Sequence, residues 1–359
     1  MTSAPAPGDG SPGRNGRTGP SLRAALQARA RKLAIPLHIS FELTKRCNLA
    51  CRHCYIVPRD GELPTPRWVE RVDEVAGLGC MAITLTGGEL ALYDGWREVA
   101  RAVKERRLAL SLLTNATLFG RDDLDAIADL HPLSVAASLY GSEPGLHDAI
   151  SRVAGSFERT VAALSGLRAR GVRCRIGIVV MQENVKDTAA MIALAQELDC
   201  EFRFDPTVAP RADGNRDVLI HRASGESLRL FFANDAVRGK LRSDAPRPVP
   251  SGEVGSAKGN CGAGSSSAFV DARGDVYACM GFPAPFGNVA ATGFAGVWQG
   301  AAAAGHRRAM NAPLTACAAC DLLASCTVRC PRLALVEDGD LAGVSSRACE
   351  LAGVLAEMT

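Results

Sequence analysis

Six short apolar runs alternate with helical stretches between residues 36 and 210, and this alternation constrains the fold more than any other feature. Strands that are joined in series by helices form parallel sheets with crossover connections. The sequence therefore predicts an α/β fold whose functional side chains follow the carboxyl ends of the strands. Periodicity alone does not distinguish an open, partial barrel from a nucleotide-type α/β sandwich. The apolar runs are 37–43, 82–86, 108–113, 133–139, 174–181 and 201–204, and the helical stretches are 67–78, 95–106, 122–130, 156–170 and 185–198.

The chain changes character after about residue 210. Before the strands of 36–210, residues 1–20 are rich in Pro, Gly, Ser and Arg and predict a disordered tail, and 21–35 predict a basic helix. Residues 211–260 predict a helical bridge and a linker rich in Pro, Gly and Ser. Residues 261–359 hold seven of the thirteen cysteines among short elements. A segment with so few apolar runs is expected to depend on metal for its stability.

Composition and charge exclude several classes of function. The chain is 47% hydrophobic and 22% charged, as in globular proteins. Residues 1–35 carry six basic side chains and one acidic residue, Asp9, so the net charge of this segment is +5. The net charge of the whole chain is +3, so the remaining residues sum to −2. A nearly neutral body does not suit a nucleic-acid partner. Glycines and prolines interrupt the uncharged stretch 276–305, so we expect no membrane helix.

No basic-then-apolar signal peptide opens the chain, so we expect a cytoplasmic protein. Disulfide frameworks are rare in the cytosol, and the cysteines are therefore expected to hold metal or to do redox work. Three other cysteines are expected to be buried packing residues, because Cys80 opens the second predicted strand, Cys174 lies in the fifth and Cys200 precedes the sixth.

Cys47, Cys51 and Cys54 follow the first predicted strand with the spacing Cys-x3-Cys-x2-Cys. Three thiolates from one loop leave the fourth iron of a [4Fe–4S] cubane without a protein ligand. A structural zinc site needs four ligands. The spacing therefore favours an iron–sulfur cluster over a partial zinc site or three unconnected thiols.

Together with Tyr55, these cysteines resemble the signature of the radical S-adenosylmethionine (SAM) superfamily. The resemblance implies a partial (β/α)6 TIM-type barrel in which the open iron chelates the amino and carboxylate groups of SAM. An electron from the reduced cluster then cleaves SAM, and the resulting 5′-deoxyadenosyl radical abstracts a substrate hydrogen.

Motifs at the next strand ends are also similar to those of this family. The first is Thr86-Gly87-Gly88-Glu89, in which glycines allow close backbone approach and the acidic residue suits an ammonium group. The next are Thr114-Asn115-Ala116-Thr117, with Ala116 in place of glycine, and Ser138-Leu139-Tyr140-Gly141, with Tyr140 in place of aspartate. Each polar group taken alone is equally explained as a helix cap. The resemblance assigns SAM contacts to Tyr55, Gly87, Gly88, Glu89, Asn115, Ser138 and Asn184.

A second cysteine pattern follows residue 260 and resembles the seven-cysteine SPASM domain of radical SAM peptide-modifying enzymes. It reads Cys261-x12-Gly274-x4-Cys279, then Cys317-x2-Cys320-x5-Cys326-x3-Cys330, then Cys349. Cys317-x2-Cys320 alone is a zinc-knuckle spacing, but seven cysteines do not divide into complete tetrahedral zinc sites. A β-hairpin with its turn at Gly274 is predicted over 269–279.

The SPASM resemblance implies two auxiliary iron–sulfur clusters of the [4Fe–4S] type. It assigns the first to Cys261, Cys279 and Cys330. It assigns the second to Cys317, Cys320, Cys326 and Cys349. Some relatives supply an extra cysteine shortly before the first position, but 250–260 contain none. The first auxiliary cluster is therefore expected to have an open iron, a non-cysteine ligand or fewer irons.

Members of this branch mostly modify ribosomally made peptides by crosslinking, epimerisation or oxidation, and we expect the same here. The alternative is a radical SAM dehydrogenase or cofactor-biosynthesis enzyme acting on a small molecule or a tetrapyrrole. A sulfatase-maturating, formylglycine-forming enzyme is a lesser alternative, because such enzymes usually carry an aspartate as general base where Met280 follows Cys279. A scaffold without catalysis would leave the strand-end motifs unexplained.

The expected partners are a precursor peptide and an electron donor such as flavodoxin or ferredoxin, with no nucleic acid and no membrane. Residues 1–35 are too short for an independently folded leader-binding module, so we expect a separate small protein to bind the leader. The basic stretch 23–32 is expected to be a solvated helix face, with docking of an acidic leader as the alternative. The sequence does not specify the bond formed or the catalytic acid or base.

Overall fold

The computed structural model describes residues 22–244, 261–312, 315–317, 319–323, 325–326 and 330–358. The tail predicted over 1–20 and the part of the predicted linker at 245–260 lie outside the described residues. Helix α1 (Leu22–Leu33) lies where the sequence predicts a basic helix.

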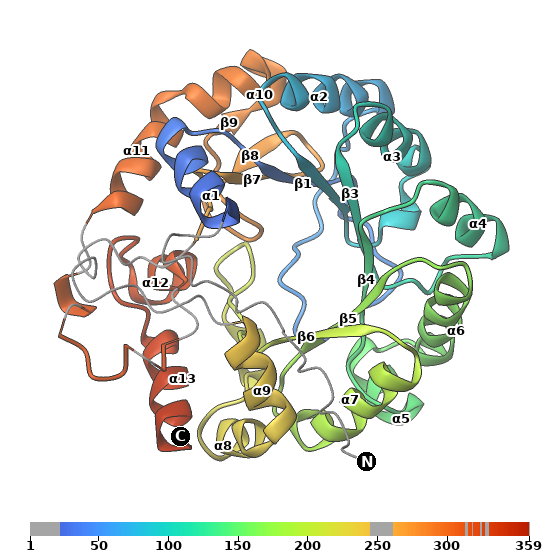
Figure 1. Ribbon diagram of the computed structural model, residues 1–359, viewed down its shortest axis with the longest axis vertical. Coiled ribbons are helices and arrows are strands. Elements are labelled where there is room, and N and C mark those ends of the chain that lie inside the picture. The colour runs from blue at the N-terminus through green and yellow to red at the C-terminus, as the bar shows by residue number, and fades with distance from the viewer. Residues whose placement is uncertain are drawn as a thin grey trace, which may run out of the picture.

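Six parallel strands form one curved sheet with helices along its outer side (Figure 1). Each strand pairs with its neighbour in chain order, without the reversal of order that marks a doubly wound sandwich. The predicted partial (β/α)6 barrel is therefore confirmed, and the sandwich is excluded. The strands are β1 (His38–Glu42), β2 (Ala82–Thr86), β3 (Ala109–Thr114), β4 (Ser134–Ser138), β5 (Cys174–Val179) and β6 (Glu201–Asp205). The connecting helices are α2 (Thr65–Gly77), α3 (Trp96–Glu105), α4 (Arg121–Asp129), α5 (Pro144–Ser151), α6 (Ser156–Ala169) and α7 (Thr188–Glu197), with short turns η1 (Leu90–Leu92) and η2 (Val185–Asp187).

The C-terminal region continues the same sheet, which the sequence did not indicate. Strand β7 (Ser267–Val270) pairs parallel with β1, and β8 (Asp275–Tyr277) and β9 (Gly287–Asn288) follow antiparallel. The predicted hairpin is β7–β8, and Gly274 in its turn has φ of 86°. The remaining elements are η3 (Asp217–His221), α8 (Gly225–Ala233), α9 (Asp235–Asp244), α10 (Val289–Gln299), α11 (Ala301–Asn311), η5 (Thr315–Cys317), α12 (Pro331–Asp338) and α13 (Ser346–Glu357).

Strand β1 shows how the sheet divides its side chains between two faces. Ile39 and Phe41 are fully buried, and the Phe41 ring packs on Trp68 of α2 with ring centroids 5.0 Å apart. Successive side chains of a strand point to opposite faces, so His38 and Glu42 face the concave side of the barrel. Glu42 thus stands on the concave face at the carboxyl end of β1.

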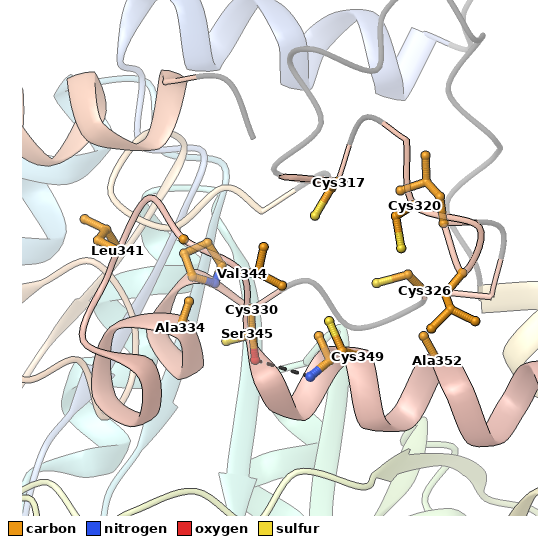
Figure 2. Close-up of a pocket in the computed structure, with 15 residues that line it drawn as sticks. Cys317, Cys320, Cys326, Cys330, Ala334, Leu341, Val344, Ser345, Cys349 and Ala352 are labelled. Carbon is orange, nitrogen blue, oxygen red and sulfur yellow. Dashed lines mark hydrogen bonds between the residues drawn. The ribbon is translucent and has the colours of Figure 1, made fainter. Parts of the chain in front are cut away.

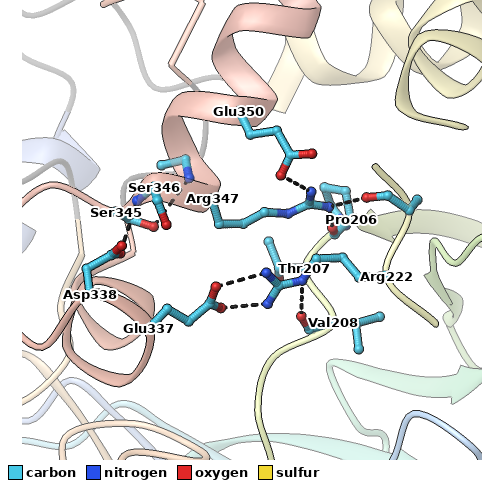
Figure 3. A network of polar contacts seen from close by, with 12 residues as sticks. Pro206, Thr207, Val208, Arg222, Glu337, Asp338, Ser345, Ser346, Arg347 and Glu350 are labelled. Carbon is cyan, nitrogen blue, oxygen red and sulfur yellow. Dashed lines mark hydrogen bonds and ion pairs between the residues drawn. The ribbon is translucent and has the colours of Figure 1, made fainter. Parts of the chain in front are cut away.

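Buried polar contacts attach α12 and α13 to the segment after β6 (Figure 3). Arg222 donates two hydrogen bonds to Glu337, at 2.6 and 2.8 Å, and a third to the Val208 carbonyl. The fully buried Arg347 side chain donates to the carbonyls of Pro206 and Ala223 and to Glu350. These bonds fix the helices that carry two of the C-terminal cysteines against the barrel. In the described part of the chain, no helix is both long and apolar enough to span a bilayer.

Replacing Glu337 with alanine should destabilise the protein by about 2 kcal/mol, because the half-buried Arg222 guanidinium loses two charged hydrogen bonds. Unfolding by urea, followed by circular dichroism, measures the loss. The matched control is Glu226→Ala, which removes an exposed carboxylate 3.9 Å from Arg229 and should leave the unfolding midpoint unchanged. Equal midpoints for the two variants would show that the Arg222–Glu337 pair does not hold the helices.

Candidate active site

Cys47, Cys51 and Cys54 lie on the loop after β1, which we call the cysteine loop (residues 43–63), at the carboxyl-end mouth of the barrel. All three are free thiols; Cys47 is exposed and the other two are half-buried. Burial raises the pKa of the Cys51 thiol to about 12, so a bound metal must displace its proton. Three thiols on one loop fit a cluster that keeps one iron open.

The described residues contain no group of three or more His, Cys, Asp or Glu side chains arranged around a single metal ion. Cys47, Cys51 and Cys54 are also one ligand short of the four that a structural zinc site takes.

The glycine pair after β2 supports the cysteine loop. The Gly88 N–H donates to the Thr44 carbonyl at 2.8 Å, and the Glu89 N–H donates to the Arg46 carbonyl at 2.8 Å. A Cβ at position 88 would lie 2.4 Å from the Arg46 carbonyl oxygen, which is closer than any real contact. Only glycine fits at position 88, because the two backbones approach each other too closely for a Cβ atom.

Glu89 is fully buried and joins the ends of β2 and β3. Its carboxylate accepts hydrogen bonds from the Thr114 hydroxyl and the Asn115 N–H, both at 2.6 Å, and from the Ala91 N–H at 3.0 Å. Burial raises the pKa of Glu89, while these three donors favour its ionised form. The structure thus uses Glu89 to hold the strand ends, and its predicted contact with the SAM amino group stays a prediction.

Asn115 links the end of β3 to the cysteine loop through its side-chain amide. Its Nδ2 donates to Asn48 Oδ1 at 2.9 Å and points to Cys47 Sγ at 3.8 Å. Asn48 in turn donates to the Thr117 hydroxyl at 2.8 Å. Sequence reasoning missed the roles of Asn48 and Thr117, although Asn48 directly follows a predicted ligand.

Tyr140, which stands where the family usually has aspartate, packs beside Cys51. Its hydroxyl lies 3.8 Å from Cys51 Sγ and hydrogen-bonds to the side chain of Ser138. The ring meets His53 edge-on at 4.7 Å and stacks on His147 at 5.4 Å between ring centroids. Ser138 is thus placed near the cysteine loop, as its predicted role requires.

Asn184 is fully buried and fastens the segment after β5. Its Oδ1 accepts from the Met181 N–H at 2.8 Å, and its Nδ2 donates to the carbonyls of Tyr140 and Val179. Its predicted contact with SAM stays a prediction.

Tyr55 lies between the cysteine loop and the C-terminal region. Burial raises the pKa of its phenol well above the ordinary value, and the charges of Glu42, Cys54 and Cys279 act in the same direction. The Tyr55 carbonyl accepts from the Ala212 N–H at 3.0 Å. Tyr55 thus lies between the cysteine loop and Cys279.

The C-terminal cysteines lie near one another in two groups, and their assignment to two auxiliary clusters stays a prediction. Burial raises the pKa of Cys279 to about 12, and the charges of Cys261 and Cys330 add to this, so these three thiols are neighbours. A cavity of ≈ 560 Å³ is lined by the four cysteines assigned to the second auxiliary cluster and also by Cys330. Figure 2 shows the sulfur atoms of the second set pointing into one space: Cys317, Cys320, Cys326 and Cys349.

The three remaining cysteines are buried, as predicted. Cys80, Cys174 and Cys200 are at most 7% exposed. Cys174 and Cys200 contact each other across β5 and the start of β6, away from both cysteine sets.

Two family models match the chain. The model of the radical SAM superfamily matches residues 41–195, and that of an iron–sulfur cluster-binding domain, SPASM, matches residues 261–321. Between them they contain the cysteine loop, the strand-end motifs and the β7–β8 hairpin.

Curated relatives are 27–30% identical to this chain over the residues that align. The mycofactocin maturase MftC of Mycobacterium ulcerans is 30% identical, over 75% of this chain and 76% of its own. The subtilosin biosynthesis protein AlbA of Bacillus subtilis is 27% identical over 71% of this chain, but the match spans only 58% of AlbA. The AdoMet-dependent heme synthase of Methanosarcina barkeri is 27% identical over 74% of this chain and 83% of its own.

Among solved structures, SuiB of Streptococcus suis bound to its precursor peptide SuiA has the same fold. The TM-score is 0.70 at 17% identity, over 91% of this chain and 80% of SuiB. At this identity the likeness concerns the fold.

Gly88→Ala should empty the cysteine loop of iron, because the new Cβ collides with the Arg46 carbonyl and displaces the loop. We expect a loss of about four irons per chain after anaerobic reconstitution, with the far-ultraviolet circular dichroism preserved. Gly77→Ala is the matched control, since a Cβ there meets nothing within 4 Å. Full iron content in Gly88→Ala would refute the supporting role of the glycine.

Proposed function

The chain belongs to the radical SAM superfamily and carries a SPASM domain, and we propose that it cleaves SAM reductively to modify a ribosomally made peptide. The cofactors of such an enzyme are SAM, one SAM-binding [4Fe–4S] cluster and auxiliary iron–sulfur clusters. The observation that carries the proposal is the set of three free thiols on one loop at the barrel mouth, supported by the strand-end segments.

The residues of the chain would divide the work as follows. Cys47, Cys51 and Cys54 would hold the SAM-binding cluster, which supplies the electron for cleavage when bound. Asn115 and Tyr140 lie against the sulfur atoms of Cys47 and Cys51 and would orient and tune that cluster.

The relatives support a peptide substrate. MftC is named as a maturase, AlbA acts in the biosynthesis of a bacteriocin, and SuiB is solved with a precursor peptide. Crosslinking, epimerisation and oxidation are all compatible with this class. Met280 after Cys279 disfavours formylglycine formation, because the family's aspartate base is absent at that position.

A second candidate is cofactor biosynthesis on a tetrapyrrole. The similarity to the heme synthase, over 83% of that protein, favours it. Incubation with SAM, dithionite and a tetrapyrrole substrate of that relative would distinguish the two, since a peptide maturase leaves the tetrapyrrole unchanged.

We further propose a cytoplasmic setting, where the thiols stay reduced, and a flavodoxin or ferredoxin as the electron donor. Leader recognition by a separate small protein is part of the same proposal.

Cys51→Ala should abolish the release of 5′-deoxyadenosine from SAM in the presence of dithionite, because the cluster loses one of its three thiolates. Liquid chromatography of the quenched reaction measures the product. Cys80→Ala removes a buried thiol outside both sets and should release the nucleoside as the native protein does. If the native protein itself released none, the proposed function would be wrong.

A further inference from the structure

A cavity of ≈ 520 Å³ lies between the cysteine loop and the β7–β8 hairpin. Tyr55, next to Cys54, lines one part of it, and Gly281, two residues after Cys279, lines another. The cavity therefore stands between the SAM-binding cysteines and the first auxiliary set. Its lining combines acidic and basic side chains, Glu42, Lys45 and Asp271, with the aromatic rings of Tyr55, Phe269, Tyr277 and Phe282.

The pairing of β1 with β7 brings two carboxylates together in this cavity. Phe41 pairs with Val270, so Glu42 and Asp271 are the next positions on neighbouring strands. The two residues are 3% and 1% exposed. Lys45 Nζ lies 2.6 Å from Asp271 Oδ2 and 3.8 Å from Glu42 Oε2.

Close hydrogen-bond donors stabilise the negative charge of the Asp271 carboxylate more than that of the Glu42 carboxylate. Asp271 accepts from Lys45 and, at 3.0 Å each, from the N–H groups of Arg273 and Asp275, so it serves the hairpin turn. The Glu42 carboxylate lies 3.8 Å from the Lys45 ammonium group and accepts a backbone hydrogen bond from Ala272.

Burial raises the pKa of Glu42 to about 7, because Lys45 does not offset the loss of water. The titratable and charged groups that surround it are Lys45, Cys54, Tyr55 and Arg59 of the cysteine loop and Asp271 and Tyr277 of the hairpin. A buried carboxyl of this kind exchanges a proton near neutral pH.

We propose that this cavity receives the peptide residue that is modified and that Glu42 accepts the proton which this residue loses. The inference rests on the proposed function. The substrate would give one hydrogen atom to the 5′-deoxyadenosyl radical of the proposed function and one proton to Glu42. Cys261, Cys279 and Cys330 would hold an auxiliary iron–sulfur cluster, which would supply the acceptor for the remaining electron. The modified peptide is thus oxidised by two electrons and is two hydrogens lighter.

The lining also indicates the class of the residue that enters. Phe269, Tyr277 and Phe282 present aromatic surface beside the charged groups of the lining, which suits a side chain that has both an apolar part and a polar group. Glu42 lies at the carboxyl end of β1, the end of the barrel at which the SAM-binding cysteines stand.

The experiment compares Glu42→Gln with the native enzyme and with Asp60→Asn, an exposed carboxylate in the same loop. Each short open reading frame that a search of the flanking DNA finds supplies a synthetic peptide as a probe, which is incubated with SAM and dithionite and analysed by mass spectrometry. We expect the native enzyme and Asp60→Asn to remove two hydrogens, and Glu42→Gln to do so about 100-fold more slowly. The native rate should rise with pH through about 7, because Glu42 must be ionised to accept a proton, and this rise should vanish in Glu42→Gln.

Iron content after anaerobic reconstitution and the far-ultraviolet circular dichroism are the controls for cluster assembly and folding, and both should be the same in Glu42→Gln and in the native enzyme. Glu42→Asp should retain the pH-dependent rise at a reduced rate. If the native enzyme releases the nucleoside but leaves both the mass and the stereochemistry of the peptide unchanged, the proposed function is wrong and the inference with it. If the native enzyme only epimerises the peptide, the inference alone is wrong. If the native enzyme modifies the peptide and Glu42→Gln matches it in rate and pH profile, the inference alone is wrong.

Discussion

The site depends on the close approach of two backbones, where the glycine pair after β2 meets the start of the cysteine loop. Both hydrogen bonds in this contact, from Gly88 and Glu89 to the carbonyls of Thr44 and Arg46, need the absence of a Cβ at position 88. The other end of the metal-binding stretch is held by the carbonyls of Ile150 and Ser151, which accept from Arg52 and Ala50. A loop fixed on both sides can present three thiols in one geometry without a fourth ligand.

The second constraint is the pairing of β7 with the edge of the barrel. It turns a cysteine-rich region with few apolar runs into a continuation of a well-packed sheet. The pairing also places Cys279, which follows β8, close to Tyr55 and hence to Cys54. Arg222 and Arg347 fix the far side of the same region. The distance between the cysteine sets is thus set by strand register and buried ion pairs.

Local patterns were enough to predict a parallel α/β sheet and a metal-binding loop after its first strand, because strand and helix periods and ligand spacings are properties of short segments. The partial barrel and the grouping of the C-terminal cysteines came from the family resemblance. The pairing of β7 with β1 was not predictable, since it joins segments more than 220 residues apart and any strand edge could have received the hairpin. Glu42 was missed because its neighbours form an apolar run. The available signal was that Glu42 and His38 lie an even number of residues apart in one strand and therefore on the same, concave face. Asn184 and Glu89 show the converse: position alone did not reveal that their polar atoms are bonded to the chain itself.

The central claim is that SAM binds directly to an iron held by Cys47, Cys51 and Cys54. Low-temperature electron paramagnetic resonance of the reduced enzyme, with SAM labelled at its amino nitrogen, tests it most directly. The account predicts that SAM changes the spectrum of one cluster and that the labelled nitrogen couples to its unpaired spin. A spectrum that is identical with and without SAM, and that carries no coupling to the label, would contradict it.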